Sequence, residues 1–291
     1  MKKNNQFSRI ISGTMTWGKW GKDLSSKEMD SLMHECLELG ITTFDHADIY
    51  GGYAMEGAFG KAFDGSTIKR DQVQFITKCG IQYVCESRNN KVKHYNYGKD
   101  YIIWSAERSL KELKTDYLDL FLLHRPSPLM HPEEVAAALG KLMESGKVRS
   151  FGVSNFTPSQ MALIEKEIPV SGNQVEFSLT AHSVMFDGTL DDVIINDRML
   201  MSWSPLGSYF REKSEQRKRI KKALKPLRKK YKASASQLLL AWILKHPAKT
   251  YPVVGTTNPD RLKESVQAVD LNMELEDWFS LLTASQGHKV P

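Results

Sequence analysis

The stretch "TTFDHADIYGG", residues 42–52, begins like a buried β-strand and ends in a polar turn. Two β-branched threonines and a phenylalanine favour an extended, packed strand, yet Asp45 follows them directly. Tyr50 comes five positions later and precedes a pair of glycines. Aspartate is common in turns, so a strand that stops at a loop is the simplest interpretation of this stretch alone. The rest of the chain decides between a turn and a functional site.

Seven further runs of apolar residues have the same character, and segments with helical periodicity separate them. Most of the runs are continuously apolar rather than alternating, as expected for parallel strands that are buried on both faces. The eight runs are "RIISG" (9–13), "TTFD" (42–45), "VQFITK" (73–78), "LDLFLLH" (118–124), "SFGVSN" (150–155), "NQVEFS" (173–178), "MLMSWS" (199–204) and "YPVVG" (251–255).

The helical segments between these runs have recognisable starts and ends. Residues 25–40 open with Ser25 and Glu28 at the spacing of a capping box, and their apolar side chains recur at helical intervals. Three other segments show a polar cap, an early proline, or a closing glycine or proline. They are residues 131–146, 157–167 and 234–247, and a last helix is expected around 274–284.

Eight strand–helix pairs in 291 residues predict an α/β protein with a (β/α)8 TIM barrel. No linker or low-complexity break interrupts the pattern, so a single domain is expected over residues 1–291. The competing architecture is an open doubly wound sheet, which usually has a glycine-rich phosphate-binding turn after its first strand. Residues 12–21, "SGTMTWGKWG", do not match GxGxxG, and the barrel is therefore favoured.

The composition excludes several classes of protein. At 41% hydrophobic and 25% charged residues, the chain is typical of a soluble globular protein. No apolar run reaches the roughly 18 residues of a membrane span, and residues 1–13 lack the apolar core of a signal peptide. We therefore expect a cytoplasmic protein without a membrane partner.

The cysteines indicate neither a disulfide framework nor a metal site. There are three, Cys36, Cys79 and Cys85, and no Cys/His spacing is typical of zinc. Cys36 is expected in the core on the apolar face of a helix. Cys79 follows Lys78, so a reactive thiolate there is the less favoured alternative.

Positive charge is concentrated in one segment. The formal net charge is +6, and residues 211–232 hold far more lysine and arginine than acid. A nucleic-acid surface is one interpretation. The segment has no interleaved aromatic residues and no nucleic-acid-binding motif, so a solvated helix face without a nucleic-acid partner is expected, part of which could border a bound anion.

Polar residues end three successive strand-like runs. In (β/α)8 barrels the site lies at the C-terminal mouth, where the strands end. Asp45, Lys78 and His124 occupy this position, and Tyr50 lies in the loop behind the first of them. Each has a simple structural explanation alone, but their shared position on neighbouring strands favours a common site.

This set of side chains suits the reduction of a carbonyl group. Hydride addition requires a proton for the developing alkoxide. A phenol has a pKa near 10 and gives up its proton poorly at neutral pH, but a nearby ammonium stabilises the phenolate and lowers that pKa. A shift of about two units corresponds to roughly 2.7 kcal/mol. The carboxylate keeps the lysine charged, and a neutral histidine can hydrogen-bond the substrate oxygen.

Seven motifs, in order along the chain, resemble the aldo-keto reductase family. They are "FDHADIYGG", "ITKCG", "DYLDLFLLHRP", "GVSNF", "NQVEFS", "SWSPLG" and "PVVGTTNPDRLKES", and the resemblance spans residues 13–265. The stretches "HADIYGGY" and "LLHRPSPLM" are similar to a bacterial oxidoreductase subgroup. The resemblance implies an (α/β)8 barrel that binds NADPH in an extended form and reduces aldehydes and ketones, with NADH as the less favoured cofactor.

The resemblance also implies the roles of individual residues. Tyr50 would be the proton donor, tuned by Lys78 and Asp45, with His124 as the fourth member of a catalytic tetrad. The implied contacts to the nicotinamide and the pyrophosphate are Gly13, Thr14, Ser154, Asn155, Gln174, Trp203, Ser204, Pro205, Leu206 and Gly207. Trp203 stands where the family usually has a tyrosine stacked under the nicotinamide, and tryptophan can stack as well.

The adenine end has a physical basis of its own. In "GTTNPDRL", residues 255–262, Asn258 is a plausible N-cap and Pro259 takes the first helical position. A helix start exposes free N–H groups and favours anions. The resemblance adds Gly255, Thr256, Thr257, Arg261, Glu264 and Ser265 as cofactor contacts, with Arg261 on the 2′-phosphate. Gly255 replaces a common lysine, which makes the preference for NADP less strict, and Ser265 replaces a usual asparagine.

The resemblance implies a small-molecule carbonyl compound as substrate, and several segments are candidates for its pocket. Aromatic residues after the strands, Trp17, Trp20, Tyr53 and Tyr83, are pocket candidates. The long connection 81–100, with His94, Tyr95 and Tyr97, is a candidate wall.

Two other functional classes remain open. The first is a cofactor-binding or regulatory subunit with little turnover, which a complete tetrad disfavours. The second is a Schiff-base aldolase that uses Lys78.

Overall fold

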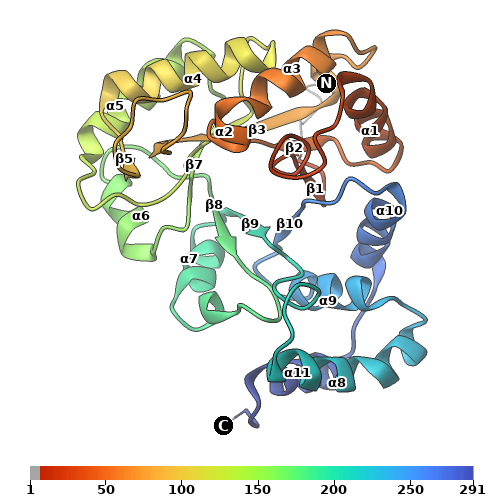
Figure 1. Ribbon diagram of the computed structural model, residues 1–291. Coiled ribbons are helices and arrows are strands. Elements are labelled where there is room, and N and C mark those ends of the chain that lie inside the picture. Colours follow the sequence, from red (N-terminus) through yellow and green to blue (C-terminus); the bar gives the residue numbers. More distant parts are fainter. Residues whose placement is uncertain (1–6, 291) are drawn as a thin grey trace, which may run out of the picture.

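Eight parallel strands close into a barrel in the computed structural model, which describes residues 7–290 (Figure 1). The strands are β1 Ile11–Gly13, β2 Thr43–Asp45, β3 Gln74–Cys79, β6 Leu120–Leu123, β7 Phe151–Ser154, β8 Gly172–Glu176, β9 Met199–Trp203 and β10 Tyr251–Val254. They follow one another around the barrel, and β10 pairs with β1 to close it. The predicted (β/α)8 TIM barrel is confirmed, and each barrel strand falls on one of the eight predicted runs.

Two sequence expectations reach beyond the described part of the chain. The expected domain bounds, 1–291, include residues 1–6 and 291, which lie outside it. The expected absence of a signal peptide concerns residues 1–13, of which 1–6 also lie outside the described residues. Within residues 7–290, no helix is both long enough and apolar enough to cross a membrane.

Eleven α-helices in the described residues accompany the strands. They are α1 Ser26–Glu38, α2 Tyr50–Tyr53, α3 Met55–Asp64, α4 Lys99–Leu113, α5 Pro132–Glu144, α6 Pro158–Ile164, α7 Thr189–Ile195, α8 Glu215–Tyr231, α9 Ala235–Leu244, α10 Pro259–Gln267 and α11 Leu275–Gln286. The predicted capping box of α1 is present, since Ser25 and Glu28 satisfy each other's backbone N–H groups. The same arrangement begins α6 and α9.

Helix α6 ends earlier than its sequence pattern indicates. The pattern predicts a helix through residue 167, but α6 stops at Ile164. Pro169 follows closely, and a proline disfavours helical geometry in the residue before it. The Glu165 side chain accepts a hydrogen bond from the Val170 N–H, which stabilises the turn that replaces the last helical turn.

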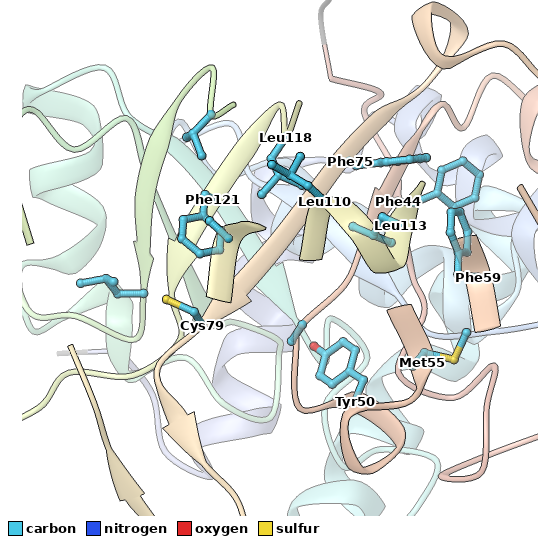
Figure 2. Close-up of a cluster of buried hydrophobic side chains, with 14 of the residues drawn as sticks. Phe44, Tyr50, Met55, Phe59, Phe75, Cys79, Leu110, Leu113, Leu118 and Phe121 are labelled. Carbon is cyan, nitrogen blue, oxygen red and sulfur yellow. The ribbon is translucent and has the colours of Figure 1, made fainter. Parts of the chain in front are cut away.

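The core is made largely of aromatic and aliphatic side chains between the barrel and its helices. Figure 2 shows part of its largest cluster, in which Phe44, Phe59 and Phe75 lie near one another and Tyr50 lies at the edge. Trp17 is fully buried and packs on Phe44 and Phe59, with ring centroids 6.0 and 5.9 Å apart. Trp17 is therefore part of the core rather than of a substrate pocket, because no ligand can reach its ring.

The connection 81–100 contains a small antiparallel ladder. Strand β4, Ile81–Gln82, pairs with β5, His94–Tyr95. The Asn96 N–H then donates to the Gly80 carbonyl, so the end of the connection is tied to its beginning. The long loop predicted from the sequence is thus a hairpin beside the barrel mouth.

The basic segment 211–232 forms helix α8, which lies beside α11 (Figure 1). Its apolar face buries Ile220, Leu224 and Leu227, while its lysines are exposed. The predicted solvated basic face is confirmed. A cavity of about 790 Å³ lies against this face, lined largely by the lysines, and no member of the predicted tetrad borders it.

Candidate active site

The strand register brings the predicted polar residues to one end of the barrel. Asp45, the last residue of β2, is paired with Gly13 at the end of β1. Lys78 lies near the end of β3, and Ser154 at the end of β7 is paired with Gln174. Because parallel strands share one direction, their carboxyl ends form a single mouth, where sites occur in this fold.

Lys78 and Asp45 form a buried ion pair at the centre of this end. The Lys78 Nζ lies 2.7 Å from each carboxylate oxygen of Asp45 and donates to the His46 carbonyl at 2.7 Å. The Lys78 and Asp45 side chains are 0% and 2% exposed. The Lys78 Nζ also lies 3.4 Å from the Tyr50 hydroxyl oxygen. The predicted proximity of the phenol to the ammonium–carboxylate pair is present.

Lys78 remains an ammonium despite its burial. Burial alone would lower the pKa of Lys78, but the charge of Asp45 and the contact with Tyr50 raise it above the ordinary value. A charged lysine therefore sits beside the phenol across the neutral pH range.

The pKa of Tyr50 differs from the expectation. Burial raises it, and the charge of Lys78 opposes this rise without reversing it, so the pKa lies above its ordinary value. The predicted lowering by the ammonium is present, but desolvation outweighs it, so the net pKa of the phenol is raised rather than lowered. Tyr50 is protonated at neutral pH, which is the form that can donate a proton.

His124 is a buried, neutral imidazole that faces Tyr50. The two rings are perpendicular, with centroids 6.1 Å apart. Burial lowers the pKa of His124 well below its ordinary value, and the charges of Lys78, Arg125 and Lys93 lower it further. The buried Nδ1 atom has no hydrogen-bond partner within residues 7–290. An unsatisfied buried polar atom is costly, and such atoms occur at catalytic sites.

Two glycines explain how Tyr50 reaches this position. Helix α2 is a single turn in which Gly51 and Gly52 have φ angles of 60° and 70°. This left-handed conformation is accessible to glycine at little cost. The backbone directly after Tyr50 therefore favours glycine at both positions of the pair in the opening motif.

A chain of hydrogen bonds connects the ion pair to Trp203. The Gln174 side-chain amide donates to Asp45 at 2.8 Å, and the Ser154 hydroxyl donates to the Gln174 carbonyl at 2.9 Å. The Asn155 amide donates to the Ser154 hydroxyl at 2.8 Å, and the Trp203 indole N–H donates to the Asn155 side-chain oxygen at 2.9 Å. The four residues predicted for the nicotinamide end are thus contiguous with the tetrad.

The segment predicted for the pyrophosphate is a strained turn after β9. Ser204 and Gly207 have positive φ angles of 48° and 56°, and the Gly207 N–H donates to the Ser204 carbonyl. A Cβ atom on Gly207 would collide with the hydroxyl groups of Ser178 and Thr180. Glycine is therefore needed here both for its conformation and for the close approach of the chain. Pro205 and Leu206 lie between these positions, with Pro205 buried.

The two residues predicted after β1 are tightly packed. A Cβ atom on Gly13 would lie 3.1 Å from a methyl carbon of Val253. The buried Thr14 hydroxyl donates to the Asp45 carbonyl at 3.1 Å and lies 2.9 Å from the His46 Nδ1. Thr14 is thus already engaged with the turn that carries Asp45.

The predicted adenine end forms an exposed helix start. The Asn258 side chain accepts from the Arg261 N–H at 3.0 Å, which confirms the N-cap, and the Arg261 side chain is exposed. Gly255, Thr256 and Thr257 lie before the cap, and all three are at least partly accessible.

The side chains of two other predicted adenine contacts already form hydrogen bonds within the protein. The Glu264 carboxylate accepts from the Ser234 hydroxyl at 2.9 Å. The Ser265 hydroxyl donates to the Arg261 carbonyl at 2.7 Å, and Ser265 is mostly buried. Of the three predicted cofactor contacts on α10, the Arg261 side chain is therefore the one most available to a ligand.

Sequence reasoning missed His46. Its carbonyl is the third acceptor of Lys78, and its ring is buried. Burial lowers the pKa of His46 to about 3, helped by the charges of Lys78 and Arg70, so the ring is neutral. Only its position directly after Asp45 could have indicated a role. Any residue type at this position has a carbonyl that can accept from Lys78, so the sequence does not reveal the contact.

Among the predicted pocket aromatics, Trp20 and Tyr83 lie near the tetrad. The Trp20 ring is 6.3 Å from Tyr50 and 5.7 Å from Tyr83, and it is 41% exposed. Tyr53 is instead structural, since its hydroxyl donates to the Ile81 carbonyl and accepts from the Tyr83 N–H. Trp20 and Tyr83 are therefore better placed than Tyr53 to contact a substrate.

In the 81–100 connection, Tyr97 points inward and His94 points outward. Tyr97 is buried, and its hydroxyl contacts the backbone of Arg125, while His94 is exposed. Tyr95 is partly buried.

The structure tests the expectations that Cys36 is a core residue and that Cys79 could be a reactive thiolate. Cys36 is buried on α1 as predicted. Cys79 is also buried, and burial raises the pKa of its thiol well above the ordinary value. Cys79 is therefore not a thiolate. No group of three or more metal-ligating side chains occurs in the part of the chain that the structure describes.

Comparison with known proteins identifies the family. The family model described as "Aldo/keto reductase family" matches residues 9–282, and the chain belongs to this family. The chain is 40% identical to the uncharacterized oxidoreductase YcsN of Bacillus subtilis, over 98% of this chain and 97% of that protein. It is 37% identical to a 6-dehydroglucose reductase of Agrobacterium fabrum, over 98% and 96%.

Solved structures agree with this result. The thermostable aldo-keto reductase Tm1743, in complex with the inhibitor epalrestat, aligns with a TM-score of 0.80 at 26% identity, over 97% of both chains. The family, the fold and the names of these relatives support an enzyme of the oxidoreductase class that acts on carbonyl groups. The family generally uses nicotinamide cofactors.

Proposed function

We propose that the protein reduces aldehydes or ketones to alcohols with NADPH, and that Tyr50 donates the proton. The observation that carries the proposal is the 3.4 Å approach of the Lys78 ammonium to the Tyr50 hydroxyl, beside the buried Asp45 carboxylate. A protonated phenol next to a fixed cation is a proton donor whose conjugate base is stabilised as it forms.

Each member of the tetrad has a separate role in this reaction. Tyr50 transfers its hydroxyl proton to the carbonyl oxygen, and the phenolate that remains is stabilised by Lys78. Asp45 keeps Lys78 charged and in place. The neutral His124 lies opposite Tyr50 and donates a hydrogen bond to the same oxygen.

The described residues fit a nicotinamide dinucleotide. The polar chain from Gln174 to Trp203 offers amide and hydroxyl groups next to the tetrad, where a carboxamide would be held. The capped start of α10 offers free N–H groups and Arg261 for a phosphate. When bound, the reduced nicotinamide supplies the hydride. The absence of a lysine at Gly255 leaves Arg261 as the main cation for a 2′-phosphate, so NADH is a weaker but usable cofactor.

The relatives suggest which carbonyl compounds to try first. A protein that is 37% identical over nearly the whole chain is named for the reduction of 6-dehydroglucose, an oxidised sugar. Hydroxylated aldehydes therefore belong in the first substrate panel, next to simple aldehydes, diketones and quinones.

The two alternative functions are less well supported. A Schiff-base lysine must lose its proton before it attacks a carbonyl, whereas Lys78 is held charged in an ion pair. A non-catalytic binding subunit has no need of a protonated phenol beside a buried ammonium.

The substrate panel, measured with both cofactors, tests the proposal. We expect loss of the absorbance of reduced nicotinamide with at least one class of carbonyl compound, and faster loss with NADPH than with NADH. Tight NADPH binding without turnover on any compound would favour the binding subunit. A substrate adduct trapped on Lys78 by borohydride would favour the aldolase.

A further inference from the structure

Arg125 follows His124 directly and lies at the mouth of the barrel. Its guanidinium carbon is 5.4 Å from the centre of the Trp203 ring, and Trp203 ends β9 on the other side of the site. The side chain is half-buried. The cation therefore lies beside the tetrad, between the end of β6 and the end of β9.

The hairpin holds the backbone of Arg125 in place. The Tyr97 hydroxyl donates to the Arg125 carbonyl at 2.5 Å and accepts from the Arg125 N–H at 3.1 Å. The Tyr97 ring packs so closely on Gly80 that a Cβ atom there would overlap it, and Gly80 has a φ of +111°. The end of the 81–100 connection thus fixes the residue next to His124.

The guanidinium group of Arg125 lacks acceptors. Within residues 7–290, the Arg125 side chain takes part in no ion pair and no hydrogen bond, and it lies over the Trp203 ring in a cation–π interaction. Arg70 and Arg198 differ, since each donates to at least one carboxylate and one backbone carbonyl. A guanidinium has five N–H donors and no acceptor, so its donors at Arg125 require oxygen atoms from elsewhere.

The charge of this part of the site is positive. Burial is the main reason for the low pKa of His124, but the charges of Arg125 and Lys93 also contribute to it. Lys93 lies in the hairpin just before β5 and is exposed. Arg125 and Lys93 therefore lie near enough to His124, like Lys78, to disfavour its charged form.

We propose that Arg125 determines substrate specificity by binding oxygen atoms, of hydroxyl or carboxylate groups, that lie a few bonds from the reacting carbonyl. The inference rests on the proposed reductase function and names its substrate class: oxygenated aldehydes or ketones rather than purely apolar ones. Arg125 would orient such a substrate, with its carbonyl oxygen between Tyr50 and His124. Guanidinium groups recognise carboxylates with paired hydrogen bonds and also donate to hydroxyls.

Paired substrates of matched length test this proposal. Propanal is compared with glyceraldehyde, and butanal with succinic semialdehyde, in the protein with NADPH. For Arg125→Met, we expect kcat/KM to fall by about 10- to 100-fold for glyceraldehyde or succinic semialdehyde, mainly through KM. The value for propanal and butanal should change less than about 3-fold, because these substrates offer Arg125 no oxygen beyond the carbonyl. Whether the hydroxylated or the carboxylated substrate loses more identifies which group Arg125 binds.

Two further variants separate specificity from folding. Arg125→Lys keeps the charge and should recover part of the loss for the oxygenated substrates. Lys91→Met removes an exposed cation from the same hairpin and should leave both pairs unchanged. Two results for Arg125→Met would overturn the inference and leave the reductase proposal intact. The first is an equal loss of kcat/KM for propanal and glyceraldehyde, and the second is an unchanged kcat/KM for both glyceraldehyde and succinic semialdehyde. Absence of turnover with every aldehyde, diketone and quinone of the panel in the wild-type protein would overturn both.

Discussion

At the scale of single residues, the site depends on the burial of one ion pair. Lys78 and Asp45 are almost inaccessible, and each satisfies the other. The same burial raises the pKa of Tyr50, so the lysine does not create a phenolate in advance. Instead, it stabilises the phenolate only when the proton has left. Stabilisation that appears as the charge develops accelerates a reaction more than uniform binding does.

Removal of one partner of this pair should be costly. In Lys78→Met, the Asp45 carboxylate keeps its burial but loses its ammonium. Breaking a buried pair in this way typically costs about 3–5 kcal/mol. We expect the free energy of unfolding, measured by urea titration, to fall by about this amount, together with the loss of reductase activity.

The matched control neutralises both partners. The double variant Lys78→Met with Asp45→Asn should regain a large part of the lost stability but none of the activity. A single Lys78→Met variant as stable as the wild type would show that the ion pair contributes nothing that a methionine cannot replace.

At the scale of elements, the loop that carries Tyr50 is tied to helix α4 by a buried carboxyl group. One oxygen of Asp48 lies 3.3 Å from the Ser105 hydroxyl and 3.4 Å from the Tyr101 hydroxyl, both on α4. The other oxygen is buried without a partner in the described residues. Burial, together with the charge of the nearby Glu56, raises the pKa of Asp48 to about 8. Burial likewise raises the pKa of Glu56 to about 7.

These two pKa values predict that the contribution of Asp48 and Glu56 to stability falls as pH rises. Both groups bind protons more tightly in the folded than in the unfolded state, so the stability they contribute is fully present below their ordinary pKa values. It is lost as the pH rises toward about 7 for Glu56 and about 8 for Asp48. The buried neutral His46 and His124 contribute in the opposite direction below about pH 6.5, so the Asp48 contribution is read as a difference: between pH 5 and pH 8 the free energy of unfolding of the wild type should fall relative to that of Asp48→Asn.

Urea titrations at several pH values provide the measurement. Asp116→Asn, which changes an exposed carboxylate, is the control and should keep the wild-type slope. The same pH dependence in the wild type and in Asp48→Asn would show that Asp48 is already ionised in the folded protein at pH 5.

Helix α10 provides a second prediction at this scale. Arg261 is exposed in its first turn, while its backbone N–H forms the N-cap hydrogen bond with Asn258. Arg261→Ala therefore removes the cation but keeps the helix start. If the side chain binds the 2′-phosphate, the affinity for NADPH should fall about 10- to 100-fold, the range of a hydrogen bond to a charged group.

Fluorescence titration with both cofactors measures this difference. The affinity for NADH should change less than about 2-fold, because NADH has no 2′-phosphate for a charged hydrogen bond. Lys263→Ala, an exposed cation on the same helix, is the control and should affect neither cofactor. Equal weakening of NADPH and NADH would place Arg261 elsewhere on the cofactor or outside its site.

At the scale of the whole molecule, the barrel could be predicted from the sequence because the same strand and helix patterns recur eight times along the chain. Each of the eight strands is a short, continuous apolar run, and the intervening helices have caps whose geometry depends on neighbouring residues only. The end of each strand then determines which side chains face the mouth. The order of residues along the chain was therefore enough to bring Asp45, Lys78 and His124 together.

Other features depend on contacts between distant residues and could not be predicted. Trp17 is in the core rather than in the pocket, because Phe44 and Phe59 surround it. The hairpin of β4 and β5 has strands of two residues, which are too short for a hydrophobic pattern. The pKa of Tyr50 is set by burial, which residue type alone does not reveal.

The central claim is that the Tyr50 hydroxyl supplies the proton for carbonyl reduction. Tyr50→Phe removes that hydroxyl and keeps the ring that packs at the edge of the core (Figure 2). The direct measurement is the steady-state rate of NADPH oxidation with the best substrate of the panel, together with the affinity for NADPH. We expect the rate to fall at least about 100-fold, as for the loss of a general acid, with an almost unchanged affinity for NADPH. A rate within a few-fold of the wild type would contradict the account.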